Sequence, residues 1–367
     1  MNITYILTAL DAGGVGIVSR TLVNQMIEIG HNVTLVALNR GHNDQAVSSP
    51  TVIFPYHQTN ASVFLLSFLR LCIYFARNRN IQSIIVASDY PAIITILACK
   101  LTRHPARILV NSHTTVSVYA ASQSRFKQAL LGAARILYRK ADFVCNVSQG
   151  AAADSATFFN LPHVHTLYNP ACDDAMLSYV PPHAPHPWLS NPGLKCIISC
   201  GRLAPEKNIS LMLKAFAEVS ARQPGLRLLI LGDGEQKEEL IQQARELNVS
   251  SRVAFTGHVS NPRDYFYFAR GLWLTSYYEG LPTVLIEAMA TGIPCIAVNC
   301  PSGPAEVLEN GVYGKLVEGW DVKKNASAML GFLQEEPKPR SFYKQRAAFF
   351  GIENRTQAYL KLLENRT

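Results

Sequence analysis

The chain has 367 residues, of which 48% are hydrophobic and 16% are charged. A hydrophobic fraction this high excludes a disordered chain, and the length predicts two domains of ordinary size. The formal net charge is +8, and residues 1–170 hold 13 Lys and Arg against 6 Asp and Glu. A basic first half suits an anionic lipid surface, nucleic acid or a phosphorylated substrate, and equally a basic protein with no such partner.

The first half alternates short β-rich runs with helical patterns. NITYIL predicts a strand, and residues 16–29 carry apolar side chains at helical spacing. HNVTLVAL, SIIVAS, RILVNSH and FVCNVS predict further strands. This order predicts a parallel sheet covered by helices on both faces within a domain of residues 1–170.

The apolar stretch of residues 61–77 contains Arg70 and is too short to span a bilayer, so we expect a buried or interfacial helix there. The N-terminal MNITYIL has neither a basic region nor a cleavage site, which argues against a signal peptide. We therefore expect a cytoplasmic protein. The eight cysteines form no CxxC pair, which favours buried thiols and predicts no metal site.

Residues 171–194 are rich in proline and predict an interdomain linker. The strand–helix alternation then restarts over residues 195–352, and residues 353–367 predict a last helix that could pack back on the first domain. The expected fold class is thus α/β, with two doubly wound, Rossmann-like domains facing a central cleft. In such domains ligands bind beyond the carboxyl ends of the strands.

EGLPTVLIEAMATGIP, residues 279–294, predicts a helix that starts near Leu281 or Pro282, with Gly292 after its end. Open backbone N–H groups at the start of such a helix, together with the helix dipole, favour an anion. Glu279 precedes this anion site, and Glu287 is expected about two turns inside the helix. Two carboxylates on either side of an anion site could hold hydroxylated groups, as in a nucleotide sugar.

EGLPTVLIEAMATGIPCIA resembles the E-x7-E signature of retaining glycosyltransferases with the GT-B fold, the GT4 or "glycosyl transferases group 1" family. SCGRLAPEKNISLMLKAF, LLILGDGE, VAFTGHV and GPAEVLENGVYGKLV match further segments in family order, and NCPSGPAEVLENG is similar to members that build polyprenyl-diphosphate-linked glycans. The resemblance is tight over the second half. In the first half it rests on DAGGVGIVSRTLVNQMIEIGHNVTLV and NSH.

The resemblance implies a role for several residues. Arg202 and Lys207 would bind the donor diphosphate, Glu279 the donor sugar and Glu287 the ribose. His113 would lie by the donor sugar or the acceptor. It implies catalytic roles for Glu279, Arg202, Lys207 and His113, and donor binding by Gly14, Arg202, Lys207, Val259, Glu279, Gly280, Leu281, Pro282, Thr283 and Glu287.

Gly13 and Gly14 lie before the first helix, where a residue without Cβ lets a phosphate approach the backbone. A plain strand-to-helix turn is the alternative. The first domain is expected to bind the acceptor, and the second to bind the donor.

The implied reaction moves a hexose or N-acetylhexosamine from a nucleotide-diphosphate sugar, with UDP favoured, to a glycan that is lipid-linked, in surface polysaccharide or oligosaccharide assembly. It needs no metal and no cofactor beyond the co-substrate. A GDP-mannose-dependent mannosyltransferase and a nucleotide-sugar epimerase are the alternatives, together with a non-catalytic module that binds lipid or nucleic acid. The presence of all four residues Arg202, Lys207, Glu279 and Glu287 argues against the last.

RFKQALLGAARILYRK, residues 125–140, places basic side chains among apolar ones. This pattern predicts an amphipathic basic helix, which could lie on an anionic membrane or present a solvated basic face. The charge asymmetry favours the membrane. We therefore expect peripheral association with the inner face of the cell membrane and no nucleic-acid partner.

Overall fold

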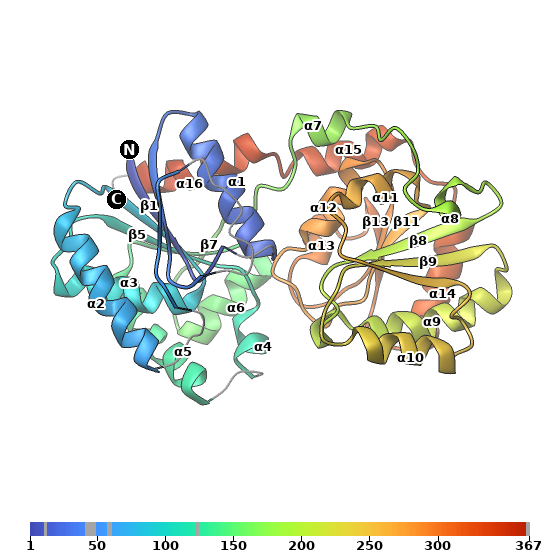
Figure 1. Cartoon of the computed structure of the whole chain (residues 1–367), viewed down its shortest axis with the longest axis horizontal. Helices are drawn as coiled ribbons and strands as arrows, with labels where there is room; N and C mark the ends of the chain where they lie inside the picture. Colours follow the sequence, from blue (N-terminus) through green and yellow to red (C-terminus); the bar gives the residue numbers. More distant parts are fainter. Residues whose placement is uncertain (11–12, 41–48, 57–60, 122–124, 365–367) are drawn as a thin grey trace. The chain divides into compact units, whose positions relative to one another are not determined.

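The computed structural model describes residues 1–10, 13–40, 49–56, 61–121 and 125–364. The chain divides into two compact units (Figure 1). The first comprises Met1–Pro170 with Ile352–Thr367, and the second Ala171–Gly351.

The first unit has a parallel sheet of order β3-β2-β1-β4-β5-β6-β7. Its strands are β1 (Asn2–Leu7), β2 (Asn32–Ala37), β3 (Thr51–Ile53), β4 (Ser83–Ala87), β5 (Arg107–Ser112), β6 (Phe143–Asn146) and β7 (His165–Thr166). Its helices are α1 (Gly14–Glu28), α2 (Ala61–Arg77), α3 (Asp89–Leu101), α4 (Val116–Ala121), α5 (Arg125–Leu137), the 3₁₀ turn η1 (Tyr138–Lys140), α6 (Gln149–Phe159) and α16 (Ile352–Glu364).

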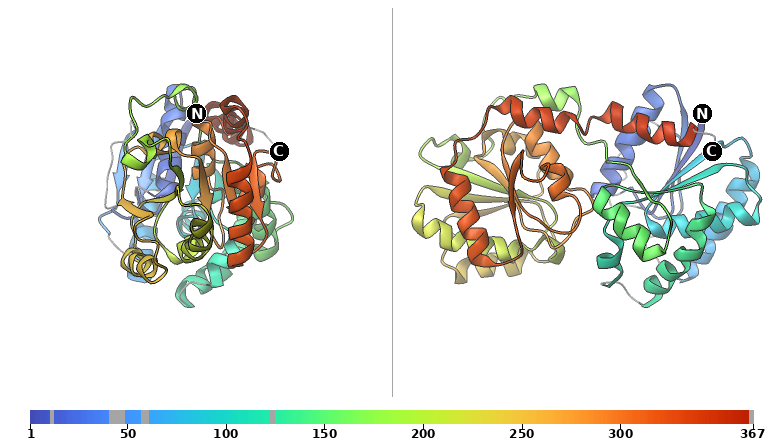
Figure 2. Two further views of the ribbon diagram at one scale, coloured as in Figure 1. Left: turned by 90° about the vertical axis from the view of Figure 1, so that its right-hand side faces the viewer. Right: turned by 180° about the vertical axis from the view of Figure 1, so that it is seen from behind.

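Helices cover both faces of this sheet because successive strand residues point to opposite sides. Ile84 and Val110 pack with α2, α3 and α5, whereas Ile85 and Leu109 pack with α1 and α16. Figure 1 shows α2, α3 and α5 on one side of the sheet, and Figure 2 shows α16 beside α1 on the other. The near-continuous apolar strands therefore have a physical reason, since both of their faces are buried.

The last helix, α16, completes the core of the first unit. Tyr359 is fully buried and its hydroxyl accepts a hydrogen bond from Asn111 Nδ2 at 2.8 Å. Arg107 Nη1 donates to the carbonyl of Leu363 at 2.9 Å. The first unit is thus built from the two ends of the chain.

The second unit has a parallel sheet of order β10-β9-β8-β11-β12-β13. Its strands are β8 (Lys195–Cys200), β9 (Leu226–Leu231), β10 (Val253–Gly257), β11 (Gly271–Leu274), β12 (Cys295–Val298) and β13 (Gly314–Val317). Its helices are α7 (Asp174–Ser178), α8 (Pro187–Ser190), η2 (Pro205–Lys207), α9 (Ile209–Arg222), α10 (Lys237–Glu246), α11 (Pro262–Phe268), α12 (Thr283–Ala290), α13 (Pro304–Val307), α14 (Val322–Gln334) and α15 (Arg340–Ala348).

The proline-rich residues 171–194 carry two short helices and group with the second unit. Asp173 caps α7 by accepting from the N–H of Met176 at 2.6 Å, and His186 Nδ1 accepts from the N–H of Trp188 at the start of α8. The segment α7 packs against α12 and α15. Local caps therefore stabilise helices that the proline content obscured.

Each sheet has one point at which the order of the strands reverses, between β1 and β4 in the first unit and between β8 and β11 in the second. The loops that leave the carboxyl ends of the two strands at such a point diverge, and the space between them is where α/β folds bind ligands. Among the helices that the structure describes, none is long and apolar enough to cross a membrane.

Candidate functional site

Lys207 and Glu279 meet at the reversal point of the second sheet. Lys207 ends η2 after β8, and Glu279 lies in the loop after β11, so two neighbouring strands deliver residues that are 72 positions apart. Lys207 Nζ donates to Glu279 Oε1 at 2.7 Å. The Glu279 side chain is only 11% exposed. The structure thus brings together two of the residues predicted to bind the donor.

Neighbouring side chains hold this pair in place. Ser276 Oγ donates to Glu279 Oε1 at 2.6 Å, and Trp320 Nε1 donates to the backbone carbonyl of Ser276 at 3.0 Å. Thr275 Oγ1 donates to the carbonyl of Lys207 at 3.2 Å. The three side chains Thr275, Ser276 and Trp320 were not predicted. In the sequence, only the position of Thr275 and Ser276 in LTSYYEG, shortly before Glu279, indicates that these two residues belong to the site. No sequence pattern indicates Trp320.

Lys207 keeps its charge although it is largely buried. Burial by itself lowers the pKa of this lysine, but the Glu279 carboxylate and, more weakly, Glu206 outweigh that effect, so the pKa is raised. Burial also raises the pKa of the nearby thiols of Cys200 and Cys300 to about 12. At neutral pH these thiols are uncharged, and the site's positive charge comes from Lys207 and Arg202.

Arg202 is the more exposed cation, with a side chain 64% exposed. Its Nη2 donates to the Glu206 carboxylate, while the carbonyl of Glu206 accepts from the N–H of Tyr277 at 2.8 Å. Glu206 therefore ties the loop after β8 to the loop after β11.

Glycines allow the loops around this site to pack backbone against backbone. Gly232 has a φ of +135°, and a Cβ there would lie 1.9 Å from the carbonyl oxygen of Gly201. A Cβ on Gly234 would lie 2.4 Å from the carbonyl oxygen of Leu203. The GR and GDG motifs thus meet because neither turn leaves room for a side chain.

The helix α12 begins at Thr283, with Pro282 as its N-cap residue, one or two residues later than expected. In the part of the chain that the structure describes, the backbone N–H groups of Gly280, Leu281, Thr283 and Val284 donate to no acceptor. Leu285 is the first to be paired, with the carbonyl of Pro282 at 3.0 Å. These open donors lie close in the chain to Glu279, where the sequence predicts an anion site.

Glu287 lies one turn inside α12, about 6 Å along the axis, because the helix begins only four residues earlier. The expectation of two turns was wrong, since residues 279–282 form an irregular loop. The Thr283 side chain hydrogen-bonds the Glu287 carboxylate, because residues four positions apart lie on the same face of a helix. Burial raises the pKa of Glu287, and the Thr283 hydrogen bond and the charge of Arg263 partly counter it.

Arg263 belongs to a polar cluster that the sequence analysis missed. Its Nε donates to Asn261 Oδ1 at 3.1 Å, and its guanidinium lies 5.7 Å from the centre of the Tyr179 ring. Asp264 accepts from the Tyr179 hydroxyl and from Asn261 Nδ2 at 2.5 and 2.8 Å. The helix α11 packs on α12, which brings Arg263 within electrostatic reach of Glu287. Only the NPRD tetrapeptide signals this cluster.

The remaining predicted residues occupy separate places. Val259 is half-buried in the loop after β10, two residues beyond Gly257. His113 and Gly14 belong to the first unit. Gly14 begins α1, and a Cβ on Gly13 or Gly14 would meet nothing within 4 Å, so no described neighbour requires a glycine there.

His113 follows β5 and lies with its Nε2 3.3 Å from Asn111 Nδ2. Burial lowers the pKa of His113 to about 4, so the ring is neutral at pH 7. A neutral imidazole at the end of a strand can donate or accept a hydrogen bond but does not supply charge.

The first unit also buries an acidic group that the sequence did not reveal. Asp89 Oδ1 accepts from Ser112 Oγ at 2.7 Å and from the Tyr138 hydroxyl at 2.6 Å. Burial raises the pKa of Asp89. Because the three residues come from α3, β5 and η1, we assign this cluster a structural role.

The fold and the family models that the sequence matches both indicate the same class of enzyme. Two doubly wound α/β units, each built on a parallel sheet, define the GT-B class. HepE from Anabaena, solved in complex with UDP, shares the fold with a TM-score of 0.77 over 98% of this chain and 99% of that one, at 19% identity. Residues 12–174 match Glycosyltransferase Family 4, and residues 184–348 match Glycosyl transferases group 1. The chain belongs to this GT4 family of glycosyltransferases.

Two relatives match most of the chain. One is the amylovoran biosynthesis glycosyltransferase AmsD of Erwinia amylovora, 25% identical over 83% of this chain and 82% of the relative. The other, from Campylobacter jejuni, is the N-acetylgalactosamine-N,N'-diacetylbacillosaminyl-diphospho-undecaprenol 4-alpha-N-acetylgalactosaminyltransferase. It is 30% identical over 77% of this chain and 74% of its own length.

Proposed function

We propose that this glycosyltransferase moves a hexose or N-acetylhexosamine from a UDP-sugar to a lipid-linked glycan, with retention of the anomeric configuration. The observation that carries the proposal is the Lys207–Glu279 pair beside the open N–H groups that precede and begin α12. A cation and amide donors suit a diphosphate, and a held carboxylate beside them suits sugar hydroxyls.

In the proposed donor complex Lys207 and Arg202 contact the diphosphate, and the N–H groups of Gly280, Leu281 and Thr283 complete its cradle. Glu279 accepts from hydroxyls of the transferred sugar. Glu287, one turn into α12, accepts from the ribose, while the loop at Val259 contacts the base. Donor binding then separates Lys207 from Glu279, because the phosphate oxygens compete with the carboxylate for the ammonium group.

The proposed step breaks the bond between the anomeric carbon and the β-phosphate oxygen. The acceptor hydroxyl oxygen forms its bond on the same face, and its proton passes to the departing phosphate oxygen. Charge grows on the diphosphate as that bond breaks, and Lys207 with Arg202 stabilises it. These two cations carry the role of a metal ion in our proposal.

The relatives support the choice of substrates. HepE is solved with UDP, and the Campylobacter relative is named for transfer of N-acetylgalactosamine to a glycan on undecaprenyl diphosphate. We assign the acceptor to the first unit, with the neutral His113 as a hydrogen-bonding group and the Gly13–Gly14 turn as a place where a phosphate can approach the backbone. Polysaccharide or oligosaccharide assembly follows from the same relatives.

The test has two stages. Calorimetry should show binding of UDP at millimolar concentration or tighter, and of GDP more weakly. A panel of UDP-sugars with an undecaprenyl-diphosphate-linked acceptor should then give a product whose anomeric configuration, read by NMR, equals that of the donor. Preference for GDP-mannose would favour the mannosyltransferase alternative, and turnover of the donor alone to an epimeric sugar would favour the epimerase. Absence of heat with both nucleotides would contradict the proposal.

A further inference from the structure

The outward face of α2 is unusually apolar. Four large side chains on it are exposed, namely Leu65 (57%), Leu66 (46%), Leu69 (48%) and Ile73 (53%). Their spacing places them in one stripe along the helix, while Leu71 and Phe75 on the other side are fully buried. Single exposed leucines are ordinary, but a row of four on one helix marks a surface that something covers.

The charge around this stripe is almost entirely positive. Residues 61–140 contain eleven basic residues and a single acidic one, Asp89. The basic residues are Arg70, Arg77, Arg79, Lys100, Arg103, Arg107, Arg125, Lys127, Arg135, Arg139 and Lys140. Because Asp89 is buried, the described part of α2, α3, α5 and η1 presents no acidic side chain to solvent. Residues 61–140 thus have a net charge of 11 − 1 = +10, compared with +8 for the whole chain, and eight of the eleven basic residues lie on α2, α3, α5 and η1.

The three helices form one layer on the same face of the first sheet, where α3 packs against both α2 and α5 (Figure 1). The sequence pattern predicted an amphipathic basic helix over residues 125–140, and α5 with η1 lies there. Its apolar residues Leu131, Ala134 and Tyr138 are buried in the core of the unit, whereas Arg135, Arg139 and Lys140 are exposed. Within this layer α5 therefore offers mainly charge, and α2 offers the apolar surface.

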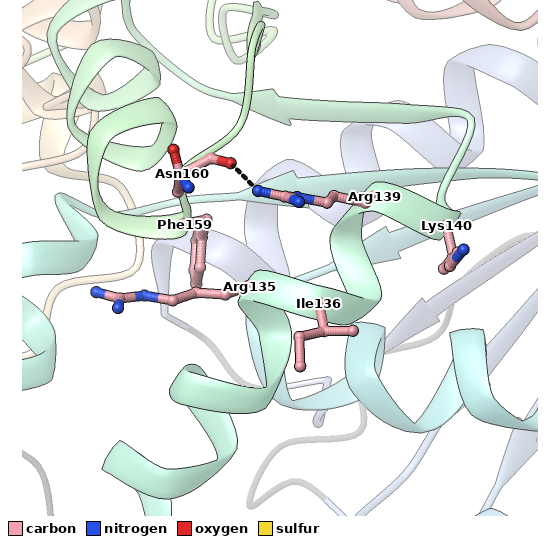
Figure 3. A pocket seen from close by; sticks show the side chains of 6 residues that line it. All are labelled: Arg135, Ile136, Arg139, Lys140, Phe159 and Asn160. Carbon is pink, nitrogen blue, oxygen red and sulfur yellow. Dashed lines mark hydrogen bonds between the residues drawn. The ribbon is translucent and has the colours of Figure 1, made fainter.

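The far end of the layer is an open, basic pocket of about 380 Å³. Figure 3 shows Arg135, Arg139 and Lys140 around it, with Arg139 Nη2 donating to the carbonyl of Asn160 at 3.0 Å. Ile136, beside them, is 71% exposed. Cations next to an exposed aliphatic side chain suit a group that is anionic at one end and apolar at the other.

We propose that the layer of α2, α3 and α5 docks on an anionic lipid bilayer. The Leu65–Ile73 stripe enters the boundary between headgroups and acyl chains, with α2 lying in the plane of the surface. The basic side chains of α2, α3, α5 and η1 lie over lipid phosphates. This is the arrangement of interfacial amphipathic helices, in which apolar burial and attraction to anionic lipid add together.

Other occupants fit less well. Nucleic acid binds to cations and to aromatic or polar side chains, and exposed leucines would gain nothing from it. A second copy packed by a two-fold axis would place each basic layer against the other, with no acidic partner for Arg70 or Arg77. The proposal does not depend on the donor chemistry. Given the proposed function, it brings the first unit to a membrane-embedded acceptor.

Sedimentation of the full-length protein with vesicles tests the proposal. Binding is expected to phosphatidylglycerol–phosphatidylcholine vesicles and not to pure phosphatidylcholine. The double change Leu66→Glu with Leu69→Glu should weaken binding at least about tenfold, and each of Arg139→Gln and Lys140→Gln about fivefold. Val312→Glu and Arg222→Gln, which are exposed positions in the second unit, serve as matched controls and should leave binding unchanged.

Circular dichroism and UDP calorimetry on every variant keep the two proposals separate, because a surface change should leave UDP binding intact. The milder pair Leu66→Ala with Leu69→Ala replaces the glutamate variant if that protein does not fold. The proposal is overturned if anionic vesicles do not bind, if the controls lose as much as the stripe variants, or if the stripe changes abolish a dimer or RNA binding instead.

Discussion

The proposed donor site of the second unit and the basic layer of the first unit encode their properties in opposite ways. The site depends on a few side chains in a fixed order, GRLAPEKN and then EGLPTVLIE, whose loops can meet only at one point of the sheet. The layer depends on many side chains, of which none is individually special. A short motif therefore predicts chemistry well, whereas a surface becomes visible only when burial separates the outer side chains from the inner ones.

The largest expected effect comes from the pair at the centre of the site. Glu279→Gln should lower transfer by about a hundredfold to a thousandfold while the protein stays folded, because an amide cannot accept hydroxyl hydrogen bonds as strongly as the carboxylate. The initial rate with saturating donor is the measurement. Glu246→Gln, on the exposed side of α10, is the matched control. Wild-type activity in Glu279→Gln would show that the Glu279 carboxylate does not contribute to transfer.

The next largest effect is expected on stability, in the core of the first unit. Tyr359→Ala should cost about 3–5 kcal/mol of unfolding free energy, because a fully buried ring and its hydrogen bond to Asn111 are lost together. Denaturant titration measures this loss. Lys361→Ala, exposed on the same helix, should stay within about 0.5 kcal/mol of the wild type. Equal effects of the two changes would mean that α16 does not complete this core.

The third prediction concerns Glu287, whose protonation should make UDP binding depend on pH. Its raised pKa means that protonation begins at a higher pH than for a free glutamate, so UDP affinity should fall as the pH is lowered through that range. Stability changes in the opposite sense, since ionising the buried carboxyl costs free energy as the pH rises. The charged and titratable groups near it are Arg263 on α11 and the neutral Cys200 thiol at the end of β8.

Calorimetry of UDP binding from acid to neutral pH checks the Glu287 prediction. The Glu287→Gln variant should bind UDP more weakly at neutral pH, and its affinity should depend less on pH. A variant with the pH profile of the wild type would show that another group is titrating.

The smallest expected effect concerns Arg263. Arg263→Ala should raise the donor KM about threefold to tenfold and leave kcat nearly unchanged, because Glu287 loses the positive charge that favours its ionised form. The acidic limb of the pH profile of kcat/KM should also shift to higher pH. Arg245→Ala, on the exposed side of α10, is the control. A change in kcat alone would place Arg263 elsewhere in the reaction.

The order of the elements and the places of the donor-type motifs could be predicted from the sequence because both depend on local patterns: short apolar β-rich runs, helical spacing, and glycines where backbones touch. The sequence misplaced Glu287 by a turn because nothing in EGLP shows how far the irregular loop extends. It missed Asp89 and Arg263 because their partners, Tyr138 and Tyr179, are distant in the chain. It identified α5 as amphipathic but did not single out the exposed apolar stripe of α2, because composition does not show which side of a helix faces the core.

The return of α16 to the first unit has a consequence for synthesis of the protein. The ribosome finishes residues 1–170 early, yet the sheet face that carries Tyr5 and Leu109 is covered only in part, by α1, until residues 352–364 emerge. At ordinary translation rates the intervening residues take roughly ten to forty seconds to make. During that interval the nascent first unit exposes an apolar surface, so chaperone demand and misfolding should concentrate there, and the unit that begins first is the last to be completed.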